Sequence, residues 1–73
     1  MKIGCPKEIK PQEFRVGMTP NAAYEAVNKG HEVVIEAGAG IGAGFDDAAY
    51  TDAGATILAT AKEVFDSADM IVK

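Results

Sequence analysis

Four short apolar runs, separated by stretches that carry helix signals, constrain the fold of this chain more than any other feature. The clearest is the β-branched triplet at residues 33–35, which a glutamate flanks on each side. A short run that is apolar throughout is typical of a parallel strand with both faces buried. Residues 2–5, 56–58 and 69–73 have a similar character, so we expect four strands.

Helix signals fill the intervals between these runs. A Thr-Pro pair, a capping hydroxyl followed by a proline at the first helical position, begins a helix that we expect over 20–29. Thr60, with a glutamate three residues later, matches the capping box and predicts a helix to about Asp66. A shorter helix is expected over 47–53. The alternation predicts an α/β fold, a parallel sheet of about four strands with βαβ crossovers, as in half of a Rossmann-like or flavodoxin-like fold.

Length and charge narrow the classes of function. The chain has 73 residues, enough for one small domain at most. Its 7 basic residues face 11 acidic ones and form no cluster, so we expect neither nucleic acid nor an anionic membrane as a partner. The N-terminus has no signal-peptide core, and no run of about 18 apolar residues occurs, so we place the protein in the cytoplasm.

Two residue types with reactive side chains occur once each. Cys5 has no histidine or cysteine near it at the spacing of metal ligands, so we expect a small buried residue at a strand end, without a disulfide or a metal. His31 follows the first predicted helix, near its negative end. We expect it at the solvent edge rather than in catalysis.

The glycine-rich stretch at 38–43 fits the dinucleotide pattern G-x-G-x-x-A and follows a predicted strand. That pattern requires its third small residue to open a full helix, whereas Gly44 and Phe45 intervene here. It also requires an acidic residue about 20 positions further on. Residues 56–59 contain none, so we interpret the stretch as a flexible connection and expect no cofactor-binding residue in it.

Arg15 lies between the first predicted strand and the first helix. Open α/β sheets bind ligands beyond the carboxyl ends of their strands, which is where this loop begins. A guanidinium is planar and stays charged, so it can bind a carboxylate through two parallel hydrogen bonds. Considered alone, Arg15 is equally well interpreted as a surface residue paired with Glu8 or Glu13.

The string of motifs as a whole resembles the N-terminus of alanine dehydrogenases. The resemblance is carried, in order, by residues 2–4, 6–10, 13–20, 30–33, 36–45, 53–55 and 68–73. It implies an enzyme that interconverts L-alanine with pyruvate and ammonia, using NAD, from a two-domain subunit in a homo-oligomer, commonly a hexamer. It places residues 1–73 at the start of the substrate domain and implies that Arg15 binds the substrate carboxylate.

The resemblance also implies that most of the active site lies elsewhere. Lys73 matches the first lysine of a Lys-Val-Lys-Glu-Pro run whose second lysine binds substrate, and the family's catalytic histidine and nucleotide fingerprint come later. The last apolar run lacks a further neighbour, so we expect a truncated substrate domain with no catalytic residue and no turnover of its own. Two alternatives stay open: the NAD-binding subunit of a proton-translocating NAD(P) transhydrogenase, whose N-terminus has a similar pattern, and a non-catalytic small α/β module.

Overall fold

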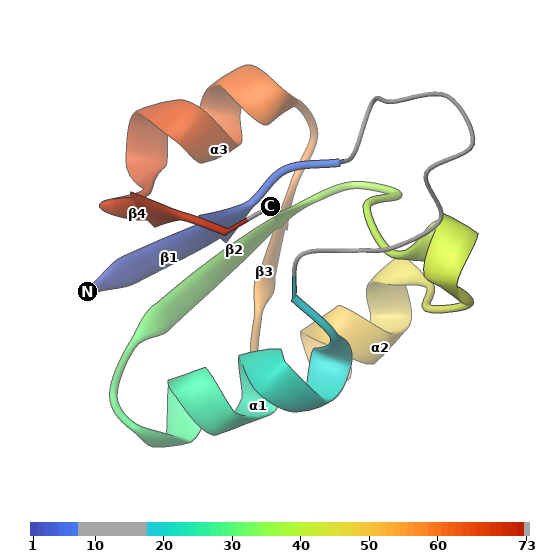
Figure 1. Cartoon of the computed structure of the whole chain (residues 1–73), viewed down its shortest axis with the longest axis horizontal. Helices are drawn as coiled ribbons and strands as arrows, with labels where there is room; N and C mark the ends of the chain where they lie inside the picture. Colours follow the sequence, from blue (N-terminus) through green and yellow to red (C-terminus); the bar gives the residue numbers. More distant parts are fainter. Residues whose placement is uncertain (8–17, 73) are drawn as a thin grey trace.

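A four-stranded sheet with helices on both faces forms the fold (Figure 1). The computed structural model describes residues 1–7 and 18–72. Its elements are strand β1 (Lys2–Cys5), helix α1 (Pro20–Asn28), strand β2 (Glu32–Glu36), the 3-10 helix η1 (Ile41–Ala43), helix α2 (Asp47–Asp52), strand β3 (Thr56–Leu58), helix α3 (Ala61–Ser67) and strand β4 (Met70–Ile71). The predicted alternation of strands and helices is confirmed. Among the described residues, η1 is the regular element that the sequence did not predict.

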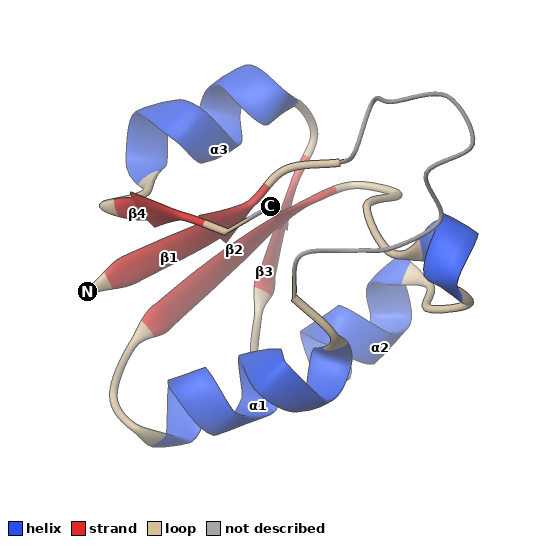
Figure 2. Ribbon diagram, in the orientation of Figure 1, coloured by secondary structure: helices blue, strands red, loops and turns tan. Residues whose placement is uncertain are grey.

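The strands all run parallel, in the order β3-β2-β1-β4. Ile3 of β1 lies between Val33 of β2 and Met70 of β4, which sets the register across the centre of the sheet. Helices α1 and α2 cover one face and α3 covers the other (Figure 2). The chain therefore moves outward from β1 to β3 and then crosses to the far side of β1. The strand order reverses between β1 and β4, and such a point is where doubly wound sheets bind ligands.

The main core lies between the sheet and the two helices α1 and α2. Alternate residues of a strand point to opposite faces, and Ile3, Cys5, Val33 and Ile35 all point to this one. Cys5 is completely buried at the end of β1, which confirms its predicted role as a small core residue. Tyr50 of α2 is the largest fully buried side chain among the described residues.

The opposite face is covered more thinly, by α3. Val64 of this helix is fully buried, and Gly4 of β1 lies directly beneath it. A Cβ atom at Gly4 would lie 2.7 Å from the Ala68 Cβ and 2.8 Å from the Val64 Cγ1, so only glycine permits this close approach of helix to strand.

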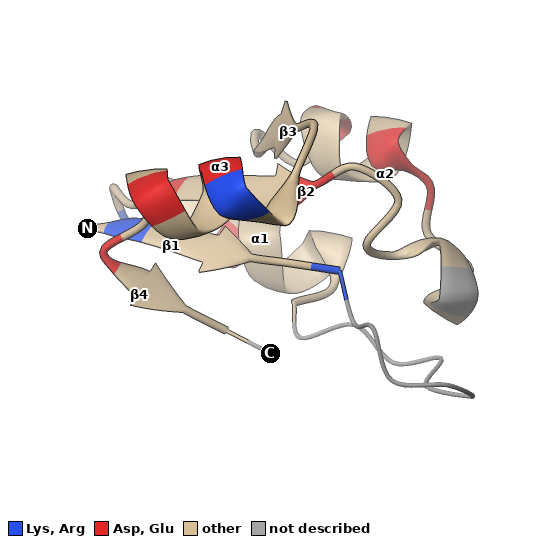
Figure 3. Cartoon of the chain, turned by 90° about the horizontal axis from the view of Figure 1, so that it is seen from above, with Lys and Arg blue, Asp and Glu red and all other residues tan. Residues whose placement is uncertain are grey.

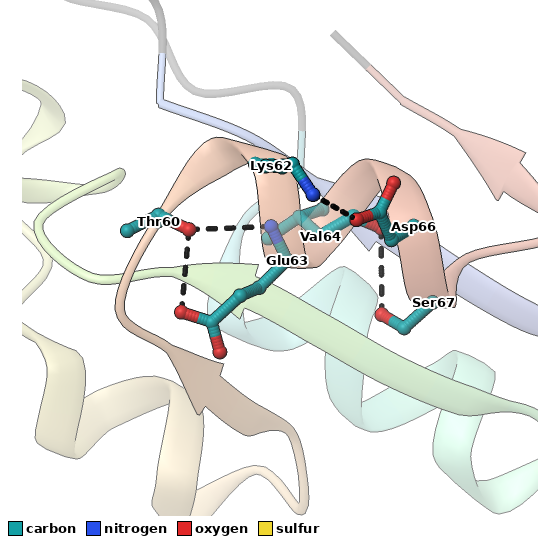
Figure 4. Close-up of polar contacts among 6 residues, drawn as sticks. All are labelled: Thr60, Lys62, Glu63, Val64, Asp66 and Ser67. Carbon is teal, nitrogen blue, oxygen red and sulfur yellow. Dashed lines mark hydrogen bonds and ion pairs between the residues drawn. The ribbon is translucent and has the colours of Figure 1, made fainter.

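Side chains cap the helices where the sequence predicted them. The Thr19 hydroxyl accepts the Ala22 N–H at 3.2 Å, and the Thr60 hydroxyl accepts the Glu63 N–H at 3.2 Å (Figure 4). The Glu63 carboxylate accepts the Thr60 hydroxyl proton, also at 3.2 Å, whereas a standard capping box directs this carboxylate to the backbone N–H of the cap residue. The helix start is capped in either arrangement.

Candidate functional site

The carboxyl edge of the sheet gathers the ends of β1 and β2, the glycine loop at 37–44 and the first turn of α2. The Lys7 N–H, just after β1, donates to the Glu36 Oε1 at the end of β2, at 2.7 Å. The Gly38 N–H donates to the Asp47 Oδ1 at 2.8 Å. Carboxylates thus bind the loop backbone at two points, and each bond is of the charge-assisted kind.

Arg15, which we predicted to bind a substrate carboxylate, lies outside the described residues, in the range 8–17. The residues on either side of this range are described, and both belong to the carboxyl edge. Lys7 is bound to Glu36, and the buried Met18 accepts a hydrogen bond on its carbonyl from the Tyr50 hydroxyl at 2.8 Å. The role of Arg15 stays a prediction. Its loop leaves β1 beside the point where the strand order reverses.

The glycine loop is held by its own hydrogen bonds, which corrects the expectation of a flexible connection. The Phe45 and Ala43 N–H groups both donate to the Gly40 carbonyl, at 2.8 and 3.0 Å, which closes the 3-10 turn between them. A Cβ at Gly40 would lie 2.7 Å from two atoms of the Tyr50 ring and hydroxyl. Composition alone could not show this, because the order comes from contact with a helix that follows in the sequence.

The same geometry bears on the dinucleotide pattern. Ala43, the third small residue of the pattern, ends a 3-10 turn, and α2 begins only at Asp47. Two acidic residues, Asp46 and Asp47, stand at the start of α2, and Figure 3 shows the acidic character of this helix. Asp47 already accepts the Gly38 N–H that a phosphate would need. The view that this loop does not bind the cofactor stays a prediction, and these contacts support it.

Tyr50 is the residue of this edge that the sequence reasoning missed. Its side chain is completely buried, its ring lies 6.5 Å from that of Phe45 in an edge-to-face arrangement, and its hydroxyl bonds Met18. Burial, reinforced by the neighbouring Cys5 and Asp47, raises the pKa of the Tyr50 phenol to about 12. The available signal was an aromatic residue on a two-turn helix otherwise made of small and polar residues, since a buried phenol needs a hydrogen-bond partner.

His31 lies at the opposite edge of the sheet, just before β2 begins. It is half-buried rather than at the solvent edge: its N–H donates to the Ala26 carbonyl at 3.1 Å, and its Nδ1 atom is buried with no hydrogen-bond partner among the described residues. The structure therefore does not bring His31 together with the loop that contains Arg15.

Two further searches covered the described ranges. In residues 1–7 and 18–72, no three His, Cys, Asp or Glu side chains gather as metal ligands. None of the helices in that part of the chain has the length and apolar character needed to cross a membrane.

Comparison with known proteins gives close matches over the whole chain. The family described as "Alanine dehydrogenase/PNT, N-terminal domain" matches residues 4–73. The chain is 58% identical to an alanine dehydrogenase of Methanococcus maripaludis and 51% identical to an NAD(P) transhydrogenase subunit alpha of Cereibacter sphaeroides, over 100% of its length and 20% and 14% of theirs. A solved L-alanine dehydrogenase superposes with a TM-score of 0.96 at 53% identity, covering 100% of this chain and 20% of that one. The chain thus spans about a fifth or less of the length of these relatives.

Proposed function

Since the chain belongs to the alanine dehydrogenase/PNT N-terminal domain family, we propose that it forms the N-terminal segment of the substrate domain of an NAD-dependent L-alanine dehydrogenase. The observation that carries the proposal is the family match over residues 4–73. The sheet order supports it, because the loop with Arg15 begins where open α/β sheets bind ligands.

The proposed enzyme interconverts L-alanine with pyruvate and ammonia. NAD, bound by a second domain, supplies the hydride chemistry, while this segment helps to bind and orient the amino or keto acid. We further propose that the enzyme is a cytoplasmic homo-oligomer, commonly a hexamer.

In this proposal, Arg15 binds the carboxylate that alanine and pyruvate share. A charged, bidentate contact of this kind contributes about 1.5 to 3 kcal/mol, so its removal should weaken pyruvate binding on the order of 10- to 100-fold. The test is the Arg15→Ala variant of the full-length dehydrogenase, with KM measured separately for pyruvate and NADH. We expect the pyruvate KM to rise and the NADH KM to stay unchanged. An unchanged pyruvate KM would remove Arg15 from the substrate site.

The 73-residue chain by itself is expected to be inactive. The assay is pyruvate- and ammonia-dependent oxidation of NADH by the isolated chain, with the full-length dehydrogenase as the positive control. Turnover above the background rate would contradict this expectation, because the proposed mechanism takes its nucleotide site from another domain.

A transhydrogenase subunit is the second candidate, and the identity to the Cereibacter sphaeroides protein favours it over unrelated functions. Both candidates transfer a hydride, but only the dehydrogenase needs a site for a keto acid. Reduction of pyruvate by the full-length protein would decide for the dehydrogenase. Hydride transfer between two nicotinamide nucleotides, without any effect of pyruvate, would decide for the transhydrogenase.

A further inference from the structure

We propose that Tyr50 and Glu36 are positioning residues for Arg15, because they fix the chain on the two sides of its loop. This role rests on the proposed function, in which Arg15 binds a substrate carboxylate. The two residues come from different elements, α2 and β2, and neither has been linked above to substrate.

Tyr50 acts on the side where the loop leads into α1. Its hydroxyl donates to the Met18 carbonyl at 2.8 Å, three residues after Arg15. Both partners are buried, so breaking this bond would leave a carbonyl without water or another donor, which is costly. The ring cannot easily move away, because Gly40 approaches it so closely that a Cβ there would lie 2.7 Å from the ring. The position of Met18 is therefore set by α2 and the glycine loop.

Glu36 acts on the side where the loop leaves β1. Its Oε1 atom accepts the Lys7 N–H at 2.7 Å, eight residues before Arg15 and 29 residues away in sequence. A bond between a carboxylate and a backbone N–H is short and strong compared with a neutral one. Glu36 is the last residue of β2, which pairs with β1, so the carboxylate is carried by the rigid centre of the sheet.

Both contacts hold backbone atoms, so they act on the path of the chain whatever side chains stand at Lys7 and Met18. A bidentate carboxylate contact depends on the position and the plane of the guanidinium. Displacements of about 1 Å are enough to weaken catalysis strongly. Releasing either contact should therefore weaken substrate binding through Arg15 without removing a group that touches substrate.

The test is a double-mutant cycle in the full-length dehydrogenase, with Tyr50→Phe, Glu36→Ala and Arg15→Ala made singly and in pairs. Tyr50→Phe keeps the ring and removes only the hydroxyl, and we expect it to raise the pyruvate KM about 3- to 10-fold. Glu36→Ala should raise it by a similar factor, and the NADH KM should not change in either variant. In the Arg15→Ala background, neither change should raise the pyruvate KM further. Tyr24→Phe is the matched control, because Tyr24 is exposed on α1.

The cycle separates a positioning role from a merely structural one. If Tyr50→Phe and Glu36→Ala raise the pyruvate KM by the same factor with and without Arg15, the two residues do not act through it and the proposal is wrong. An unchanged pyruvate KM in both single variants overturns it as well. If Tyr50→Phe does not fold, the Glu36 half of the cycle decides. A wild-type protein that does not reduce pyruvate refutes the proposed function itself, which is a different result from additive effects in an active enzyme.

Discussion

The Tyr50 hydroxyl shows how a single buried group connects stability with the candidate site. It is fully buried and donates to the Met18 carbonyl, so the neutral phenol fits its surroundings and the phenolate does not. Burial, together with the Cys5 and Asp47 side chains, raises the pKa from 10.0 to about 12. A residue that bears on the loop of Arg15 is therefore also one whose ionisation opposes folding.

We predict that stability falls between pH 10 and pH 12 because of Tyr50. Below pH 10 the phenol is protonated in both states and its contribution is fully present. As the pH rises through this window, the unfolded chain ionises first and is favoured, by roughly 2 to 3 kcal/mol in total. Urea unfolding of the chain across this range, compared with Tyr50→Phe, measures the effect.

The Tyr24→Phe variant supplies the spectroscopic check, because Tyr50 is then the sole tyrosine of the chain. Tyrosinate absorbance should appear only near pH 12 in the folded protein. Its appearance near pH 10, before unfolding, would show that the hydroxyl is not held as described.

At the scale of elements, local signals identified most helices and strands, while contacts between distant residues could not be foreseen. Thr19 and Thr60 cap the helices that they were predicted to begin, and the triplet at 33–35 forms the buried centre of β2. These features depend on neighbours in sequence. The order of the glycine loop depends instead on Tyr50, and the clamp at the end of β1 depends on Glu36, 29 residues from Lys7. Arg15 was identified through family resemblance, and its geometry lies outside the described residues.

The contact of α3 with β1 gives a prediction at this scale. Gly4→Ala places a methyl group 2.7 Å from the Ala68 Cβ, so α3 has to move away from the sheet. We expect a loss of about 1 to 3 kcal/mol in the free energy of unfolding, the usual range for an overpacked core. Thermal or denaturant unfolding of the 73-residue chain measures the loss.

A second substitution shows whether the clash is the cause. Ala68→Gly in the Gly4→Ala background removes the methyl group that is struck and should restore part of the stability. The control is Gly44→Ala, where nothing lies within 4 Å but φ is +92°, so the cost is backbone strain and Ala68→Gly should not recover it. Equal recovery in both backgrounds would argue against the steric explanation.

At the scale of the whole molecule, the reversal of strand order organises both the proposed function and the stability. Strand β1 has a neighbour on each side, and helices from both faces meet over it. The loop that follows it carries Arg15 away from the best supported part of the sheet. Strand β4, by contrast, is short, and Met70 is 43% exposed. The side of the sheet beyond β4 is therefore the less stable one.

This difference predicts the order in which backbone amides exchange with solvent. Residues 33–35 of β2 are buried and lie between β1 and β3, so opening them requires global unfolding. The Val72 N–H, which donates to the Gly4 carbonyl at 2.8 Å, depends on β4 alone and should exchange through local opening. In hydrogen exchange of the 73-residue chain followed by NMR, we expect the amides of 33–35 to be protected at least ten times more strongly, a difference of about 1.4 kcal/mol or more. Equal protection would mean that β4 is as firmly held as the centre, and that the sheet opens as one cooperative unit in which the loop of Arg15 has no specially stable support.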